Sequence, residues 1–293
     1  MRLQRTLRKE IVFNGIGLHT GRQVTVKLKP APRDSGIVFF RSDKQAFINA
    51  NMQAVCDTAF ATTLGINGTR VKTIEHLMAA LSGLGIDNLL IEIDGSEVPI
   101  LDGSSAGFVE LILKGGIAKQ ASKRPHLRIT KPIIFKEGHS EISALPFNGR
   151  KITYQIYFNH KLLGKQQMSI ELEEKSFIKE LAPARTFGFL KDVEYLRANG
   201  LARGGSLDNA VILSESSVLN STGLRFKDEF LRHKLLDFIG DTSLIGFPIY
   251  GHLIASRSGH TTNLKFITAL MAAADCWEIV TDIKQPKKAI AYS

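Results

Sequence analysis

The sequence predicts an α+β fold in two domains of similar make-up. In each half of the chain, strand-like segments come first and helix-like segments follow, which is the order found in α+β domains. A polar stretch that ends in a proline, residues 119–125, separates the halves and predicts a linker. The 293 residues are 44% apolar, which suffices for two hydrophobic cores. We therefore expect domains over residues 1–120 and 126–293.

In the N-terminal half, β-branched or aromatic segments bounded by turn residues predict strands at residues 24–28, 36–40 and 88–93. Residues 73–84 predict a helix, because apolar residues recur at the spacing of one helical face. The apolar residues of this face are Ile74, Leu77, Met78 and Leu81. Thr73 precedes them and is expected to be the N-cap. A second helix is expected over residues 104–114.

The C-terminal half repeats this order, with strands expected at residues 127–129, 133–135 and 152–158. Helices are expected at about residues 176–181, 191–198, 227–239 and 263–280. In the third of these helices, large apolar residues cover one side. His233, Asp237 and Asp241 share the other side, with Lys234 beside them. Gly240 interrupts the pattern, so Asp241 is expected at the helix end.

The net charge of +10 calls for an anionic partner, such as nucleic acid, a membrane surface or a phosphorylated small molecule. The basic residues are spread along the chain, with small clusters at the N-terminus and at residues 284–288. No run of arginines interleaved with aromatic residues indicates a nucleic-acid groove, so no nucleic-acid partner is expected. The simplest interpretation is a solubilising surface with a local phosphate site.

The sequence also bears on the compartment. No apolar run approaches the roughly 20 residues of a membrane-spanning helix, so stable membrane insertion is not expected. The basic N-terminus is broken by Glu10 and Asn14 and lacks a signal-peptide core. Cys56 and Cys276 stand alone, which fits a reducing compartment and excludes a thiolate metal site. We therefore expect a cytoplasmic protein in which any metal is held by histidine and carboxylate.

Two helical segments carry side chains of the kinds that bind metals. His233 and Asp237 are four residues apart, so one helical turn stacks the imidazole over the carboxylate. With His76 they make two histidines and one carboxylate, the ligand set of a catalytic zinc ion with an open position. Glu75 is of the residue type that accepts a proton from an attacking water. Each segment taken alone fits an exposed helix face equally well, and the spacing does not decide between these interpretations.

Three other segments contain parts of motifs. Residues 15–21 are rich in glycine, but their spacing fits neither a dinucleotide fingerprint nor a phosphate loop, so a turn is expected. Residues 101–105 lack the frame of a nucleophile turn. His260 follows a glycine after a strand-like segment and by itself indicates no more than a buried or surface histidine.

Six segments in order along the chain nevertheless match one family: residues 15–21, 73–77, 97–104, 184–189, 228–237 and 258–260. Through them the chain, from about residue 3 to 280, resembles the bacterial UDP-3-O-acyl-N-acetylglucosamine deacetylases, the zinc enzymes of lipid A biosynthesis. The resemblance implies two α+β domains, each a sheet layered against helices, with the active site at the domain interface. It also implies a monomeric hydrolase with a Zn²⁺ cofactor and a UDP-linked, acylated amino sugar as substrate.

By this resemblance, His76, His233 and Asp237 hold zinc. Glu75 takes a proton from the water that attacks the acetamide carbonyl of the sugar. The hydroxyl of Thr186 helps to stabilise the resulting oxyanion. An amide is a poor electrophile and its nitrogen a poor leaving group, so both a Lewis acid and a proton donor are needed.

The resemblance assigns the proton donor and the substrate contacts as well. His260 is the charged partner that stabilises the intermediate and protonates the departing amine. Asp241 holds His260 or its surroundings in orientation. Lys234 is expected to meet phosphate or sugar oxygens of the substrate, and Arg257 stands where other members of the family carry lysine.

An apolar channel for the acyl chain is implied in an insertion over about residues 187–205. The residues expected to form it are Phe187, Phe189, Leu190, Val193 and Gly205. By its pattern alone, this segment fits an ordinary packed helix equally well. Several family members have a cysteine shortly after residues 57–58 that binds an inhibitory zinc ion. Ala61 stands there in this chain, which predicts weaker inhibition by excess zinc.

Two other functions are open to the sequence. A peptidase or dehydratase could use the same helices, but H-E-x-x-H is absent, and Lys72 stands where the inverted motif needs a histidine. A non-catalytic basic module that binds RNA or anionic lipid would bind no zinc and would tolerate Glu75→Ala. The deacetylase would lose most of its activity with that change and still bind metal.

Overall fold

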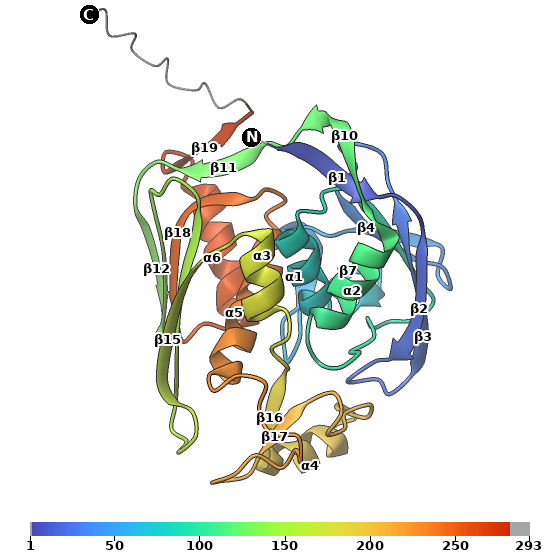
Figure 1. Cartoon of the computed structure of the whole chain (residues 1–293), viewed down its shortest axis with the longest axis vertical. Coiled ribbons are helices and arrows are strands. Elements are labelled where there is room, and N and C mark those ends of the chain that lie inside the picture. Colours follow the sequence, from blue (N-terminus) through green and yellow to red (C-terminus); the bar gives the residue numbers. More distant parts are fainter. Residues whose placement is uncertain (1, 282–293) are drawn as a thin grey trace, which may run out of the picture.

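The computed structural model describes residues 2–281 (Figure 1). Its strands and helices form an α+β fold, as predicted. Two large sheets form outer layers, and between them lie helices α1 (Glu75–Leu84), α2 (Ala106–Gly115), α5 (Glu229–Ser243) and α6 (His260–Ala272). The basic cluster at residues 284–288 and the end of the predicted second domain lie outside the described residues.

The large sheet of the N-terminal half has five strands in the order β2-β3-β9-β4-β5. Their bounds are β2 (Ile11–Ile16), β3 (Gln23–Pro30), β9 (Leu89–Ile93), β4 (Ile37–Arg41) and β5 (Ala46–Asn49). Only β4 and β9 run parallel among these neighbours. In β3, Val24, Val26 and Leu28 are buried and the residues between them are half-buried. This period of two gives the sheet one apolar face, which packs on the helices.

A smaller antiparallel sheet leads into α1. It consists of β6 (Val55–Asp57), β7 (Thr63–Ile66) and β8 (Thr69–Val71), and the short helix η1 (Met52–Ala54) precedes it. Thr62, directly before β7, is buried. The sheet therefore holds Thr62 in the interior, beside residues from the other half of the chain.

The large sheet of the C-terminal half has seven strands. They are β11 (His126–Ile129), β12 (Ile133–Glu137), β13 (Ser140–Leu145), β14 (Arg150–Phe158), β15 (Gly164–Glu171), β18 (Ile249–Ser256) and β19 (Trp277–Val280). β18 lies between β13, to which it is antiparallel, and β14, to which it is parallel. After β15 the chain forms α3 (Glu174–Ser176) and the π-helical turn η2 (Phe177–Leu181). No helix within residues 2–281 is long and apolar enough to cross a membrane.

Two predicted elements are wrong. The expected linker at residues 119–125 mostly belongs to β10 (Ile117–Lys123), which pairs antiparallel with β1 (Leu3–Leu7). Its side chains are exposed or half-buried, so its sequence is polar, and the pairing with a distant segment makes it a strand. The helix expected to reach residue 280 ends at Ala272, because residues 277–280 instead pair with β11 as β19.

Helices α1 and α5 pack against each other at the centre of the molecule (Figure 1). Every residue of α1 except Ser82 is buried, so the alternative of an exposed helix face is wrong for this segment. Gly240 allows the close approach, because a Cβ atom at this position would lie 2.2 Å from the carbonyl oxygen of Glu75. Gly240 does not interrupt α5, which continues to Ser243, so Asp241 lies inside the helix.

A small subdomain projects from one end of the molecule (Figure 1). It contains the parallel pair β16 (Phe187–Phe189) and β17 (Val211–Leu213) and the helix α4 (Leu190–Ala198). No residue of α4 is buried, and Leu190 and Tyr195 are exposed. A helix packed in a core would bury one side, so the alternative of an ordinary packed helix is wrong for this segment.

Candidate metal centre and active site

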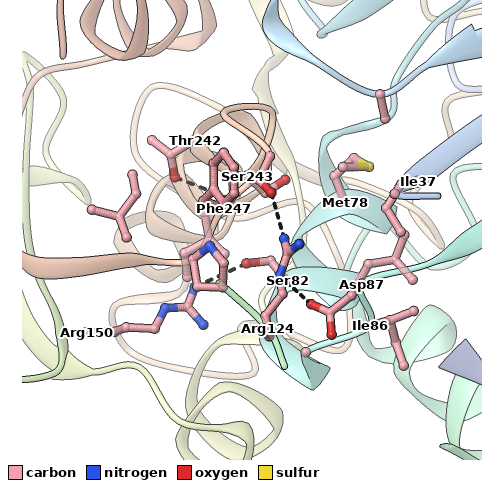
Figure 2. A pocket seen from close by; sticks show the side chains of 18 of the residues that line it. Ile37, Met78, Ser82, Ile86, Asp87, Arg124, Arg150, Thr242, Ser243 and Phe247 are labelled. Atoms are coloured by element: carbon pink, nitrogen blue, oxygen red, sulfur yellow. Dashed lines mark hydrogen bonds and ion pairs between the residues drawn. The ribbon is translucent and has the colours of Figure 1, made fainter. Parts of the chain in front are cut away.

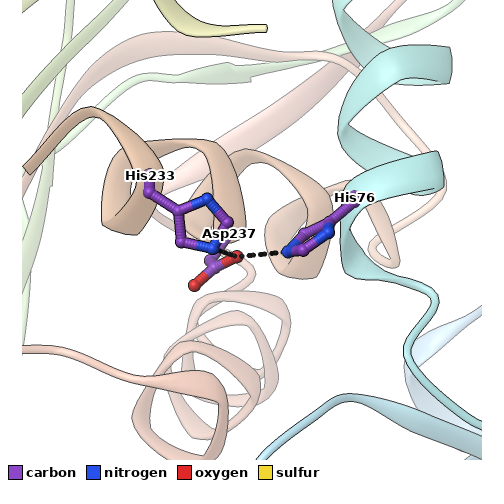
Figure 3. Close-up of side chains that lie close together, drawn as sticks. All are labelled: His76, His233 and Asp237. Atoms are coloured by element: carbon purple, nitrogen blue, oxygen red, sulfur yellow. Dashed lines mark ion pairs between the residues drawn. The ribbon is translucent and has the colours of Figure 1, made fainter. Parts of the chain in front are cut away.

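Three buried side chains from two distant helices converge in the interior (Figure 3). His76 is the second residue of α1, and His233 and Asp237 lie one turn apart on α5. Oδ1 of Asp237 lies 3.5 Å from Nε2 of His76 and 3.3 Å from Nε2 of His233. Candidate ligand atoms of the three residues all lie within 4.8 Å of one another, so one ion could contact all of them.

The protonation of His233 suits metal binding. Its Nδ1 atom lies 3.1 Å from the carbonyl oxygen of Ala184, which can only accept a hydrogen bond, so Nδ1 carries the proton. Burial lowers the pKa of His233 to about 4, against the opposing effect of the Asp237 carboxylate. The ring is therefore neutral, and its Nε2 lone pair faces the cluster. A backbone carbonyl that orients a histidine in this way is typical of metal sites.

Asp237 has one oxygen engaged and one free. Lys234 donates a hydrogen bond to Oδ2 over 2.9 Å, whereas Oδ1 is buried and has no hydrogen-bond partner among the described residues. Burial opposes the charge of Asp237, but His233 and Lys234 hold the pKa of this carboxyl well below its usual range. A buried, charged and unpartnered oxygen between two imidazoles is costly unless a cation binds it. The residues present thus fit a divalent metal held by two nitrogen atoms and one oxygen atom.

Glu75 is the first residue of α1 and lies beside His76 in sequence. It is buried, and its Oε2 accepts a hydrogen bond from the backbone N–H of Thr62 over 3.0 Å. Burial raises the pKa of Glu75, although His260 and His76 partly offset this effect. A carboxylate with a raised pKa is a stronger proton acceptor than an ordinary glutamate.

The start of α1 differs from the prediction. Thr73 is not the N-cap: Ile74 occupies that position, and Thr73 has a φ of 56°. The Thr73 hydroxyl instead donates to Glu97, whose carboxylate also accepts from the backbone N–H groups of His19 and Thr20. The glycine-rich segment 15–21 is thereby joined to the chain that enters α1.

His260 begins α6 and forms part of a buried hydrogen-bond network. Its Nδ1 lies 2.8 Å from Oδ2 of Asp241, and this oxygen also accepts from Asn263 over 2.8 Å. The hydroxyl of Thr62 donates to Oδ1 of Asp241 over 2.6 Å. Burial by itself lowers the pKa of His260, but the Asp241 carboxylate, assisted by Glu75, raises it to about 9. His260 is therefore a cation at neutral pH.

Thr62 and Asn263 are network residues that the sequence did not indicate. Thr62 lies thirteen residues before Glu75 in a strand-rich segment, and Asn263 is the fourth residue of α6. Neither belongs to a motif with a chemical meaning. Only the packing of α1, α5 and α6 brings them to the Asp241 carboxylate.

The segment containing Thr186 passes directly over α5. A buried ion pair between Arg185 and Glu229, with Nε and Oε1 2.8 Å apart, fixes this segment to the first residue of α5. On one side of Thr186, the Ala184 carbonyl contacts His233, and on the other, the Phe187 ring lies 6.4 Å from the His233 ring. Ala184 and Phe187, on the two sides of Thr186 in the chain, thus both lie next to His233.

Aromatic rings continue from the cluster toward the projecting subdomain. Phe187 lies 5.9 Å from Phe158 and 6.4 Å from Phe189, measured between ring centroids. The Phe189 ring in turn lies 5.4 Å from that of His160. Two of the expected acyl-chain residues, Phe187 and Phe189, therefore belong to a row of aromatic side chains that starts beside His233.

The remaining expected acyl-chain and substrate residues are spread more widely. Leu190 is exposed, and Val193 and Gly205 are half-buried. Lys234 lies in the metal cluster itself. The guanidinium of Arg257 is exposed and stacks 4.5 Å from the ring centroid of Tyr157, and the structure shows no contact between it and the cluster.

Comparison with known proteins places this arrangement in context. Residues 4–272 match the family model described as UDP-3-O-acyl N-acetylglycosamine deacetylase. A UDP-3-O-acyl-N-acetylglucosamine deacetylase of Thermodesulfovibrio yellowstonii is 51% identical over 282 residues, which cover 96% of each chain. One of Syntrophotalea carbinolica is 50% identical over 94% of this chain and 90% of the relative. One of Teredinibacter turnerae is 44% identical over 99% of this chain and 97% of the relative.

Proposed function

The chain belongs to the UDP-3-O-acyl N-acetylglycosamine deacetylase family, and we propose that it releases acetate from UDP-3-O-acyl-N-acetylglucosamine in lipid A biosynthesis. The observation that carries the proposal is the buried cluster of His76, His233 and Asp237 with Glu75 beside it. Relatives of that name are 50 and 51% identical to this chain over at least 90% of either length, which supports the choice of substrate.

We propose Zn²⁺ as the metal, because two imidazoles and one carboxylate without sulfur form a common catalytic zinc set. Held by these ligands, zinc supplies a Lewis acid that polarises a carbonyl group and acidifies water. Lys234 keeps the Asp237 carboxylate ionised and turned so that Oδ1 faces the two imidazoles.

Glu75 and His260 divide the proton transfers. Glu75 accepts a proton from the water molecule while the oxygen atom of that water bonds to the acetamide carbon. His260, charged at neutral pH, stabilises the negative charge that develops on the former carbonyl oxygen. When the carbon–nitrogen bond breaks, His260 gives its proton to the nitrogen, and the products are acetate and the free amine. Asp241 acts through His260, which it positions and keeps charged.

Substrate binding is assigned to two regions. The Thr186 hydroxyl would donate to the oxyanion, since the segment on both sides of it contacts His233. The line of rings from Phe187 to Phe189, continued by Leu190, Val193 and Gly205, would hold the acyl chain. Lys234 and Arg257 would serve the sugar and diphosphate. We place the reaction in the cytoplasm and expect a monomer.

Metal analysis combined with an acetate-release assay tests this proposal. The wild type should contain about one zinc per chain and release acetate, and His76→Ala should lose both metal and activity. Glu75→Ala should lose most activity and keep its zinc. A Glu75→Ala variant that releases acetate as fast as the wild type would contradict the role given to Glu75. A wild type that neither holds zinc nor releases acetate would favour a non-catalytic module that binds RNA or anionic lipid.

A further inference from the structure

A second set of charged side chains, half-buried except for the buried Asp87, lies around a cavity between the two halves of the chain (Figure 2). A cavity of about 290 Å³ is bounded by the later turns of α1, at Ser82, and by the end of α5, at Thr242. None of the proposed metal ligands or proton-transfer residues lines it. The cavity is therefore separate from the proposed active site.

The walls of the cavity combine cationic and apolar groups. Arg2, Arg124, Arg150 and Lys151 line it, whereas Asp87 supplies the only carboxylate among its described lining residues. Apolar side chains, among them Ile37, Met78 and Phe247, surround the rest (Figure 2). Three arginines with one acid leave an excess of positive charge in a partly buried space, where an anion would be strongly attracted.

The existing partners account for two of the arginines. Arg2 forms a two-pronged ion pair with Asp87, with nitrogen–oxygen distances of 2.5 and 2.8 Å. Arg124 lies 2.9 Å from the same carboxylate and also donates to the carbonyl oxygen of Gly246, just after α5. Both arginines therefore have structural roles: they neutralise Asp87, and Arg124 also donates a hydrogen bond to a backbone carbonyl near a helix end.

Arg150 is different. Among the described residues, its guanidinium makes one hydrogen bond, to the neutral hydroxyl of Ser82 over 3.2 Å, and no ion pair (Figure 2). A guanidinium has five N–H donors in a planar fork, so most of its capacity is unused. Burial, reinforced by the neighbouring Arg2 and Arg124, lowers the pKa of Arg150 to about 10, which shows how poorly its charge is compensated.

We propose that this cavity is a binding site for a small phosphorylated molecule, with Arg150 as its main contact and Arg124 as a further cation. The fork of a guanidinium matches two oxygens of a phosphate group. The volume is at the lower end of the range for ligand pockets, so a phosphate and a small organic group would fill it. The apolar wall of Met78 and Phe247 would pack against that organic group.

Such a ligand would contact both halves of the chain. Ser82 and Asp87 come from the N-terminal half, and Arg150 and Thr242 come from the C-terminal half. A ligand that binds only the folded protein stabilises it by mass action. Occupancy should therefore raise the thermal unfolding temperature and strengthen the packing of α1 on α5.

The test is calorimetric titration of the full-length, zinc-loaded protein with inorganic phosphate and with phenyl phosphate at constant ionic strength. The wild type should bind both saturably, with phenyl phosphate the tighter because of the apolar wall. Arg150→Gln should weaken both by about tenfold or more, the cost of one charge-assisted contact. The matched control is Arg8→Gln, which removes the same charge from an exposed arginine after β1 and should bind like the wild type.

A second variant, Ser82→Asp, tests the proposal even if Arg150→Gln does not fold. Ser82→Asp leaves Arg150 in place and supplies a carboxylate beside it, so phosphate binding should weaken in the same way. Absence of saturable binding to the wild type, or equal affinity in Ser82→Asp and the wild type, would overturn the proposal.

A third experiment measures binding to vesicles of phosphatidylcholine with and without phosphatidylglycerol. Binding of the anionic vesicles alone, without either free phosphate, would assign the cations to a lipid headgroup and also overturn it.

Discussion

Replacement of Asp241 by asparagine tests the link between structure and proton transfer most directly. The Asp241 carboxylate accepts hydrogen bonds from His260, Asn263 and Thr62 at 2.8, 2.8 and 2.6 Å. Asparagine has nearly the same shape but carries no charge, and it can still accept through its carbonyl oxygen. The change therefore removes the charge that faces His260 and leaves the packing of α5 and α6 largely intact.

The size of the effect follows from the pKa of His260. Burial by itself lowers this pKa, and the Asp241 carboxylate outweighs burial and raises it to about 9 from an ordinary value of 6.5. This difference corresponds to about 3 kcal/mol in favour of the charged ring. The charged form is thus present below a pH of about 9 and is lost as the pH rises through that value. Without the carboxylate, the pKa should fall to about 6.5 or lower, so at pH 7.5 about one ring in ten or fewer would be charged.

The assay is the pH dependence of acetate release by zinc-loaded wild type and Asp241→Asn. The basic limb of the profile should move to lower pH in the variant, and the rate at pH 7.5 should fall about tenfold or more, with zinc content unchanged. Thr62→Val is the control, because it removes a hydrogen bond and keeps the carboxylate, so its basic limb should not move downward. An Asp241→Asn profile with the same basic limb as the wild type would refute the assignment of His260 as the charged proton donor.

Three further predictions concern neighbouring positions. Glu75→Gln should lower kcat about 100- to 10,000-fold with zinc content unchanged, since the proton acceptor is lost while the ligands remain; loss of zinc instead would make Glu75 a structural residue. Gly240→Ala should destabilise the protein by about 1–3 kcal/mol in urea unfolding, because the added Cβ would lie 2.2 Å from the Glu75 carbonyl oxygen, whereas the Cβ of Gly188→Ala would meet only Ile212, at 3.9 Å, and this change should be nearly neutral. Ala61→Cys should increase inhibition by excess zinc; a wild type as strongly inhibited as a relative with cysteine at this place would contradict the role given to that residue.

Local spacing made much of the candidate site predictable. The interval of four residues between His233 and Asp237 places both on one face of any α-helix, whatever surrounds it. The strands predicted at residues 24–28, 88–93 and 152–158 all exist, because branched and aromatic side chains favour extended backbone. The spacing left the metal site as one of two interpretations, and the resemblance of six segments to the deacetylase family selected it.

The surroundings of the site could not be predicted from local sequence patterns. The pattern at the start of α1 did not decide whether Glu75 and His76 are exposed, and both are buried in the structure, where α1 packs against α5. Thr62 and Asn263 reach the Asp241 carboxylate from segments with no motif. β10 is a strand only because β1 lies beside it. In each case a contact between residues far apart in sequence decides the outcome.

The sequence by itself determined which residue types were available for catalysis and on which faces of their helices they would lie, since backbone geometry repeats within a few residues. The tertiary structure alone decided that these groups are buried, which of them are charged, and that Arg150 has no acidic partner within residues 2–281. The physical reason is that desolvation and charge–charge interactions depend on distances through space. Those distances exist only after the two halves of the chain have packed α1 against α5.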